Sequence, residues 1–217
     1  AKSVTPFCMD REALHSLSDD GFECTVEKNR VIFKAPHLLI KQSPKKWNFL
    51  AAFLDYDAVF NHSLLGVHGD ENVLKYLCIL INSKVFSYYQ LMTSRRWLVE
   101  RDELEAGEIL STPIPTPTEE AVNEAVTLYD KISCSSKVSS SEIDSFVYQQ
   151  FHFTPYETKL VEDAINFVFD YFNAKGKSQA LTLPDKESLQ TYSEVICDVL
   201  KNTLDKTIMF TCKIYAG

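Results

Sequence analysis

Apolar residues in the second half of the chain recur at three- and four-residue steps, which is the period of a helix with one buried face. The pattern predicts helices at 118–132, 142–148, 155–173 and 185–204. The third has the clearest start, with Thr154 as its cap, Pro155 at its first position and Glu157 at its third. The apolar residues expected along the last two helices are Leu160, Val161, Ala164, Ile165, Val168 and Phe172, then Leu189, Tyr192, Val195, Ile196, Val199 and Leu200.

The first half of the chain mixes strand-like and helical segments. Apolar and β-branched runs predict strands at 30–41, 49–60 and 62–67. Pro36 interrupts the first run, which favours an edge or a bulge there. A helical period predicts one helix over 73–93, and 207–215 is again strand-like. The expected fold is therefore α+β: an N-terminal mixed α/β lobe followed by a mainly helical region with a terminal β-strand.

The composition changes at 111–120, where three prolines alternate with other residues. Alternating prolines cannot continue a helix and favour an extended connector. We therefore expect two units, a recognition-like lobe at 1–117 and a helical lobe at 118–217.

The bulk composition is that of an ordinary globular protein, with 45% hydrophobic and 24% charged residues. No apolar run approaches the roughly 20 residues that cross a bilayer, and no secretory signal is visible, so we expect a cytoplasmic protein without membrane contact. The six cysteines lie far apart without a Cys-x-x-Cys pair, which predicts reduced structural thiols and no zinc site.

Charge is unevenly distributed along the chain. The net charge of −8 divides into −2 for residues 1–118 and −6 for residues 119–217. Within the first part, 28–54 holds six lysines and arginines and no acidic residue. This stretch is either a solvated basic strand face or a phosphate contact.

Motifs that carry catalysis are missing from the sequence. There is no glycine-rich phosphate loop, no Gly-x-Ser-x-Gly elbow and no His-Glu-x-x-His. His62 with His68, and Asp55 with Asp57, are spaced so that they could share a site, but both pairs fit ordinary surface or core positions better. The sequence favours a binding module without catalytic residues, metal ligands or a cofactor of its own.

Several segments in sequence order resemble one protein family. Residues 33–40 (FKAPHLLI) are similar to a strand of the form F-x-x-P-x followed by three hydrophobic residues. Residues 74–84 (LKYLCILINSK) resemble a hydrophobic helix ending in L-N-S-K, with Ile81 in place of leucine, and 109–115 (ILSTPIP) resembles an exit ending in P-I-P. Residues 144–165 are similar to a following helical region. Together these segments resemble the C-terminal target-recognition (specificity) region of N6-adenine DNA methyltransferases of the restriction–modification type, a family of bacterial defence.

The resemblance implies DNA binding without methyl transfer in this chain. The catalytic Asn-Pro-Pro-Tyr/Phe motif and the S-adenosylmethionine loop, which precede this region in full-length members, do not occur here. S-adenosylmethionine is accordingly expected in a parent protein, and the implied partners are duplex DNA and an upstream catalytic methyltransferase domain or subunit.

A protein that recognises a DNA sequence needs cationic side chains that bind phosphates, and it needs arginines that bind guanine. A tryptophan can stack on a sugar or base. The candidates are Lys41, Lys45, Lys46, Lys84, Arg95, Arg96, Trp97 and Arg101. For the arginines the alternative is charge balance at a helix end. Asn82 is expected instead to satisfy buried backbone and to fix the corner between strand and helix. The competing function is a non-enzymatic interaction module that docks to a partner methyltransferase or defence subunit.

Overall fold

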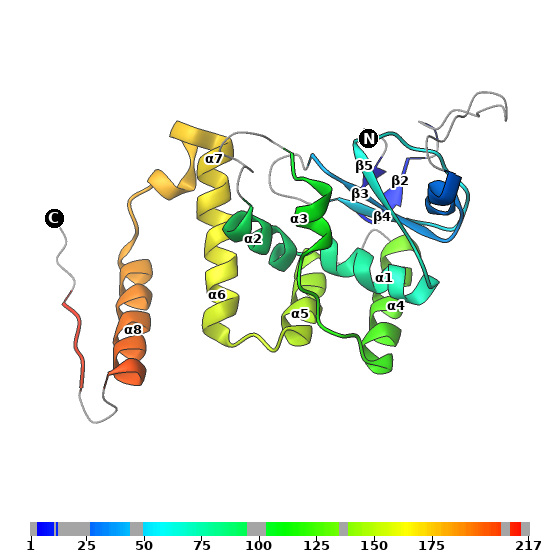
Figure 1. Cartoon of the computed structure of the whole chain (residues 1–217). Coiled ribbons are helices and arrows are strands. Elements are labelled where there is room, and N and C mark those ends of the chain that lie inside the picture. Colours follow the sequence, from blue (N-terminus) through cyan, green and yellow to red (C-terminus); the bar gives the residue numbers. More distant parts are fainter. Residues whose placement is uncertain are drawn as a thin grey trace.

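The computed structural model describes residues 4–10, 12, 27–43, 50–94, 103–134, 139–204 and 209–213. A small sheet layer lies at one end of the molecule, and helices extend away from it toward the C-terminus (Figure 1). The α+β class expected from the sequence is confirmed, since short antiparallel strands precede a mainly helical region.

The strands form two sheets. The larger has the order β4-β3-β5 and is antiparallel throughout. Its strands are β3 (His37–Lys41), β4 (Ala51–Leu54) and β5 (Leu64–His68), and the smaller sheet pairs β1 (Val4–Thr5) with β2 (Cys8–Met9). The Phe7 N–H donates to the Ala51 carbonyl at 2.9 Å, which ties the small sheet to the edge strand β4. The central strand β3 is buried along its whole length.

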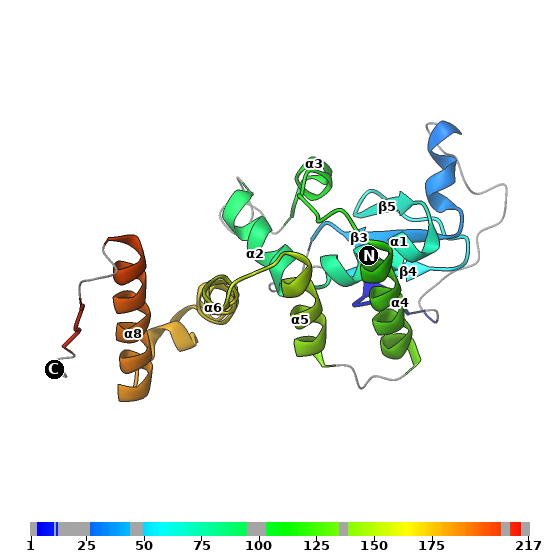
Figure 2. The ribbon, with the colours of Figure 1, turned by 90° about the horizontal axis from the view of Figure 1, so that it is seen from below.

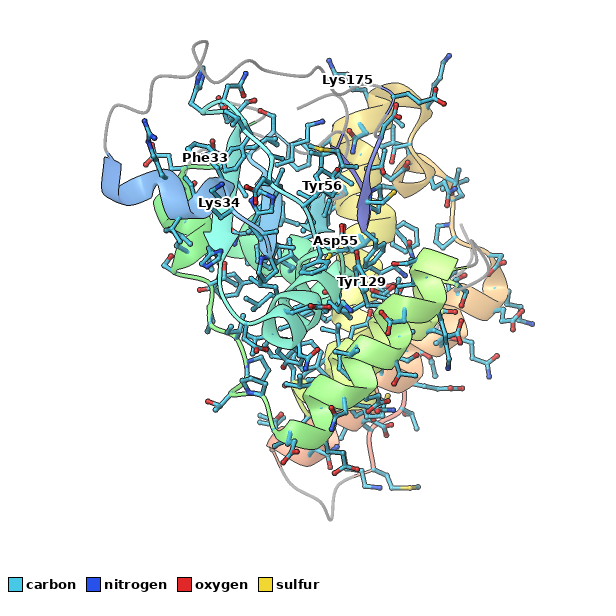
Figure 3. All side chains as sticks on the ribbon, turned by 90° about the vertical axis from the view of Figure 1, so that its right-hand side faces the viewer. Phe33, Lys34, Asp55, Tyr56, Tyr129 and Lys175 are labelled. Carbon is cyan, nitrogen blue, oxygen red and sulfur yellow. The ribbon has the colours of Figure 1, made fainter. Side chains whose placement is uncertain are left out.

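Two helices from different halves of the chain pack on each other beside the sheet. They are α1 (Glu71–Ile81) and α4 (Glu119–Cys134). Tyr129 of α4 meets Phe53 edge to face, with ring centroids 5.8 Å apart, and its hydroxyl donates to the Phe7 carbonyl at 3.0 Å (Figure 3). Burial raises the pKa of the Tyr129 hydroxyl. The first half and the helical half therefore share a core.

The remaining helices extend from this core. They are α2 (Lys84–Thr93), α3 (Ala106–Leu110), α5 (Ser140–Gln150), α6 (Pro155–Asp163), the π-helical segment η4 (Ala164–Phe169), α7 (Asp170–Ala174) and α8 (Lys186–Thr203), with the short 3-10 turns η3 (Glu27–Phe33), η5 (Lys175–Lys177) and η6 (Gln179–Leu181). Seen from below, α4, α5, α6 and α8 follow one another away from the sheet (Figure 2). One buried cluster contains residues from before and after the proline-rich segment, among them Tyr76 and Phe146, whose ring centroids lie 6.3 Å apart. The division of the chain at residue 117 stays a prediction.

Four expected elements differ from the structure, and one of them is the strand expected over 49–60, of which only Ala51–Leu54 is a strand. The single helix expected over 73–93 is two helices, because the chain turns at Asn82 and Ser83 begins a new helix as its cap. Residues 30–33 belong to the 3-10 turn η3 rather than to a strand, and Pro36, whose peptide bond with Ala35 is cis, separates this turn from β3. No strand is present in 209–213, and the rest of the expected terminal strand lies outside the described residues.

The helix start expected at Thr154, Pro155 and Glu157 is confirmed. The Thr154 side chain accepts from the Glu157 N–H and the Glu157 carboxylate accepts from the Thr154 N–H, with Pro155 in the first turn. No helix in the described part of the chain is both long enough and apolar enough to cross a membrane.

Candidate nucleic-acid interface

Two of the eight candidate DNA-binding residues lie among the described residues. Lys41 is in β3 and is only 8% exposed, which leaves its side chain little access to a phosphate. Lys84 begins α2 and its ammonium group faces two carboxylates. The other six lie outside the described residues, and they are Lys45, Lys46, Arg95, Arg96, Trp97 and Arg101.

The residues that flank these six are hydrogen-bonded to one another. The Leu104 N–H donates to the Gln42 carbonyl at 3.0 Å. Gln42 stands two residues before the segment 44–49, and Leu104 two residues after the segment 95–102. The chain therefore enters the first basic segment and leaves the second at one place on the fold.

The other end of each segment is anchored nearby. The Lys41 N–H donates to the Leu50 carbonyl at 2.9 Å, so Leu50 lies beside Lys41 where the first segment ends. Before the second segment, the Ser94 hydroxyl donates to the Glu108 carboxylate at 3.0 Å. Glu108 lies in α3, which begins immediately after Leu104 and Glu105. Both basic segments are thus attached to the edge formed by the end of β3, the end of α2 and the start of α3. We call this the β3–α3 edge.

Asn82 satisfies buried backbone, as expected, but the corner at which it stands lies between α1 and α2 rather than between a strand and a helix. Its amide nitrogen donates to the Ala51 and Cys78 carbonyls, each at 2.8 Å, and its amide oxygen accepts from the Ala51 N–H at 3.2 Å. The Asn82 side chain therefore caps the last turn of α1 and hydrogen-bonds both the N–H and the carbonyl of Ala51 in β4. Ser83 follows as the cap of α2, accepting from the Phe86 N–H at 3.3 Å.

Lys84 joins three helices. Its ammonium lies 2.7 Å from the Glu162 carboxylate of α6 and 3.5 Å from the Asp144 carboxylate of α5. The Asp144 carboxylate also accepts from the Lys84 N–H at 2.9 Å, and the Tyr148 hydroxyl donates to Glu162 at 2.8 Å. Lys84, the lysine of the N-S-K motif, was a candidate DNA contact. In the structure its contacts hold α2 against α5 and α6.

The titration of this cluster follows from its partners. Burial alone would lower the pKa of Lys84, but the hydrogen bond to Glu162 and the charge of Asp144 outweigh burial and raise it. Burial likewise works against the ionised form of Glu162, yet hydrogen bonds from Lys84 and Tyr148 hold its pKa below the ordinary value. Asp144 is more deeply buried, and its pKa is raised because burial outweighs the contacts with Lys84.

One member of each possible site pair noted in the sequence, Asp57 and His68, has a partner that belongs to the fold. Asp57 binds the Lys34 ammonium at 2.6 Å and accepts from the Ala35 N–H at 2.9 Å, and these hydrogen bonds lower its pKa. Lys34 stands beside the sheet in Figure 3. The His68 ring lies 3.2 Å from the Lys34 carbonyl. Within the described ranges, no group of three or more His, Cys, Asp or Glu side chains is arranged to hold a metal ion.

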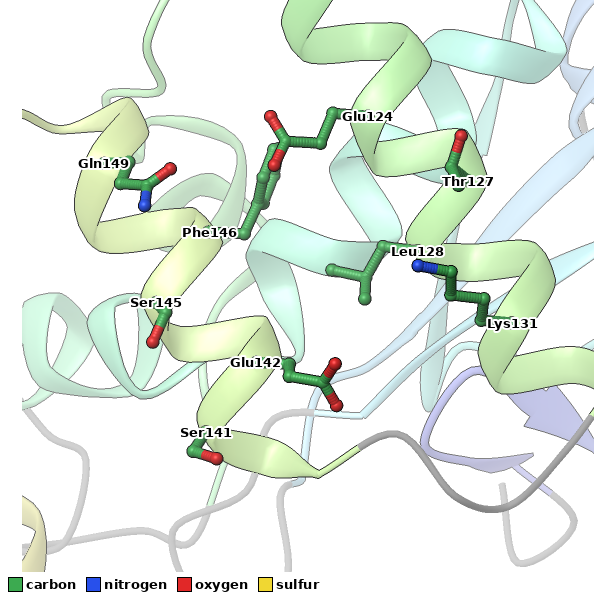
Figure 4. A pocket seen from close by; sticks show the side chains of 9 residues that line it. All are labelled: Glu124, Thr127, Leu128, Lys131, Ser141, Glu142, Ser145, Phe146 and Gln149. Carbon is green, nitrogen blue, oxygen red and sulfur yellow. The ribbon is translucent and has the colours of Figure 1, made fainter.

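A groove of about 410 Å³ lies between α4 and α5, on the helical half (Figure 4). Leu128 and Phe146 line its base, and Glu124 and Glu142 stand at its sides. Lys131 also lines the groove, so its charged lining is two carboxylates and one ammonium, which attracts a nucleic-acid backbone less than a basic surface does.

Sequence reasoning missed the partners of Lys84 and the bond between Gln42 and Leu104. Asp144 did carry a signal, because it is a carboxylate among the apolar residues Ile143, Phe146 and Val147. Nothing local marks Gln42 or Leu104, whose contact joins distant parts of the chain through backbone atoms. No protein-family model and no curated protein matches the chain.

Proposed function

We propose that the β3–α3 edge is a duplex DNA interface, and that the chain sets the target specificity of an N6-adenine DNA methyltransferase of the restriction–modification type. The observation that carries this proposal is the hydrogen bond between Leu104 and Gln42, because it attaches two separate basic segments to one edge. Methyl transfer and S-adenosylmethionine binding belong, in this proposal, to an upstream catalytic domain or subunit.

The two segments have the same short pattern. Lys45-Lys46-Trp47 stands in the first and Arg95-Arg96-Trp97 in the second, and these are the two tryptophans of the chain. Paired cations supply phosphate contacts, an arginine can bind a guanine through two hydrogen bonds, and an indole stacks on sugars or bases. Arg101 adds a third arginine close to Leu104.

Lys41 and Lys84 are not part of the proposed interface. The first is buried in the central strand, and the ammonium of the second is held by Glu162 and Asp144. We assign both to the fold. The interface therefore consists of Lys45, Lys46, Arg95, Arg96, Trp97 and Arg101.

The acidic part of the chain supports a one-sided interface. Residues 119–217 hold 15 acidic and 9 basic residues, and their helices after α4 extend away from the sheet (Figure 1). A phosphate backbone is attracted to the basic edge and repelled by the helical half, which orients the protein on the duplex.

The test is duplex binding measured by fluorescence anisotropy across a salt series. Phosphate-led binding predicts a linear fall of log affinity with log salt concentration, with a slope of about −0.9 for each phosphate contact. A variant with glutamine at Lys45, Lys46, Arg95 and Arg96 should lose most of the affinity and have a shallower slope. The control places glutamine at four exposed lysines of the helical half, Lys159, Lys177, Lys186 and Lys201, and so makes the same change in net charge.

A docking module is the second candidate function. It is favoured by the large apolar side chains that α6, α7 and α8 expose, some of them by half or more. An apolar docking surface loses no affinity as salt rises, so the same salt series separates the two functions.

A further inference from the structure

Glu108 contacts both ends of the second basic segment, 95–102. One oxygen of its carboxylate accepts from the hydroxyl of Ser94, the residue directly before the segment, at 3.0 Å. The other oxygen accepts at 3.0 Å from the N–H of Glu105, which stands three residues after the segment. A single side chain therefore joins the two ends, and we call this pair of hydrogen bonds the Glu108 clamp.

The Glu108 clamp is fixed to the fold by further contacts of α2 and α3. Gln90, which is fully buried in the last turns of α2, donates through its amide nitrogen to the Thr112 hydroxyl. The Thr112 hydroxyl donates in turn to the Glu108 carbonyl at 3.3 Å. Leu104, the neighbour of Glu105, is 1% exposed and packs in the main core. The clamp therefore acts from a buried and hydrogen-bonded base.

A carboxylate is unexpected at an edge proposed to bind DNA, because it repels phosphate. The contacts of Glu108 explain why it stands there. Its two oxygens lie at the tips of a planar fork, and each accepts from a donor on a different side of the basic segment. The geometry of the fork, rather than its charge, is what these contacts require.

We propose that Glu108 is a positioning residue of the β3–α3 edge, and that its clamp sets the place from which the arginines and Trp97 of the second basic segment reach duplex DNA. This inference rests on the proposed function. Ordering a loop and its side chains on binding costs affinity, and holding the two ends of the loop in advance removes part of that cost. Supporting contacts of this kind also determine how precisely a binding site is presented.

Three variants separate the clamp from the charge of Glu108. Glu108→Gln keeps the shape of the side chain, and its amide can still accept from the Glu105 N–H and donate to the Ser94 hydroxyl oxygen. Glu108→Ala removes the same charge together with both contacts. Ser94→Ala releases one end only, and it leaves the charge of Glu108 and the contact with Glu105 in place.

Fluorescence anisotropy with duplex DNA across a salt series is the first measurement. Glu108→Ala should weaken duplex binding about tenfold and Ser94→Ala about threefold, because the segment must then be ordered on binding. Both should keep the salt slope of the wild type, because the number of phosphate contacts is unchanged. Glu108→Gln should bind as tightly as the wild type, or up to about threefold more tightly through the loss of a negative charge. The control, Glu103→Ala, removes the charge of an exposed side chain directly after the segment and should behave like Glu108→Gln.

Limited digestion with trypsin gives a second measurement that does not depend on DNA. Trypsin cleaves after the arginines of the segment, and cleavage after Lys137, between α4 and α5, serves as the internal reference. Relative to this reference, the segment of Glu108→Ala should be cleaved about tenfold faster than that of Glu108→Gln, because proteolysis follows the population of opened chain. Circular dichroism of every variant checks that it is folded.

Weaker duplex binding and faster cleavage of Glu108→Ala, with Glu108→Gln and Glu103→Ala close to the wild type, support the proposal. Wild-type duplex binding that Glu108→Ala leaves unchanged or strengthens overturns the role of the clamp, while the proposed function stands. Equal cleavage of the alanine and glutamine variants at Glu108 also overturns it. A wild-type chain that binds no duplex overturns the proposed function, and with it the role of Glu108 in DNA binding.

Discussion

The side-chain amide of Asn82 forms two hydrogen bonds with the backbone of Ala51, one through its nitrogen and one through its oxygen. The amide nitrogen of Asn82 donates to the Ala51 carbonyl at 2.8 Å, and its amide oxygen accepts from the Ala51 N–H at 3.2 Å. The third bond, to the Cys78 carbonyl, closes the last turn of α1. This side chain shares the outer edge of β4 with Phe7, whose N–H also donates to the Ala51 carbonyl, and it joins the end of α1 to that strand.

Replacing Asn82 with alanine should therefore destabilise the fold. We expect a loss of about 1–3 kcal/mol in the free energy of unfolding, because the Ala51 N–H is left without its partner in a largely buried place, while the Ala51 and Cys78 carbonyls keep their backbone donors. Urea denaturation followed by circular dichroism measures the change. Asn72→Ala, at an exposed position of α1, is the control and should cost less than about 0.5 kcal/mol. Equal effects of the two substitutions would show that the corner contacts contribute little.

The Lys84 ammonium should matter for stability rather than for DNA. Lys84→Met leaves the buried Asp144 carboxylate without its cation, so we expect a loss of about 2–4 kcal/mol. Lys159→Met is the matched control, because Lys159 pairs with Asp163 on an exposed helix surface, where such pairs contribute less than about 1 kcal/mol. Thermal denaturation compares the two. If Lys84→Met is as stable as Lys159→Met but loses DNA affinity, Lys84 belongs to the interface after all.

Glu162 should make part of the free energy of unfolding depend on pH in the acidic range. Its pKa is lowered in the folded chain by Lys84 and Tyr148 despite burial, so below the ordinary value of 4.5 the unfolded state binds more protons. The contribution of Glu162 is therefore complete above that value and is lost as the pH falls through the lowered pKa. Asp144 acts in the opposite direction, because burial raises its pKa and its ionisation opposes folding.

A Glu162→Gln variant measures this dependence. We expect it to lose about 1.5 kcal/mol at pH 7, where a charge-assisted hydrogen bond is removed, and to approach the wild type at pH 3. Urea denaturation at several pH values gives the two curves. Glu120→Gln, exposed on α4, should give a curve parallel to that of the wild type. A loss at Glu162 that is equal at pH 3 and pH 7 would contradict the assignment.

Gly66 is required where β5 passes the Phe60 ring. A Cβ at this position would lie 2.3 Å from Phe60 Cζ. The ring packs on Phe33, with centroids 4.9 Å apart, and cannot move without losing that contact. Gly66→Ala should therefore cost about 1–3 kcal/mol.

Gly107 provides the control for this prediction. Nothing lies within 4 Å of a Cβ built there, and the residue is helical, so Gly107→Ala should stabilise the chain by up to about 1 kcal/mol. Thermal denaturation gives the sign of both changes. A Phe60→Leu substitution should recover part of the loss in Gly66→Ala, and the absence of any recovery would argue against the steric cause.

Local signals in the sequence predicted the helical half well. Thr154, Pro155 and Glu157 mark the start of α6 through contacts within one turn, and such contacts depend only on neighbours in the chain. The sequence pattern failed where distant residues decide. The helix expected over 73–93 is broken because Asn82 binds Ala51 of β4, and the period alone gives no sign of that contact.

The candidate interface illustrates the same limit. Composition singled out the basic segments, because lysines and arginines are visible one by one. Burial of Lys41 in the central strand, and the contact of Lys84 with Glu162, depend on tertiary packing and could not be predicted from charge. The hydrogen bond between Leu104 and Gln42 joins backbone atoms, which every residue has, so no pattern of side chains predicts it.

The most direct test of the proposed function is the salt dependence of duplex DNA binding for the two glutamine variants. The account predicts that the wild type and the Lys159/Lys177/Lys186/Lys201 control bind duplex with the same steep salt slope. It predicts that the Lys45/Lys46/Arg95/Arg96 variant loses most of its affinity for duplex DNA. Its salt slope should become shallower by an amount that corresponds to the loss of up to about four phosphate contacts. Equal affinity and equal slope for the two variants, or duplex binding that does not change with salt, would contradict a DNA interface at the β3–α3 edge.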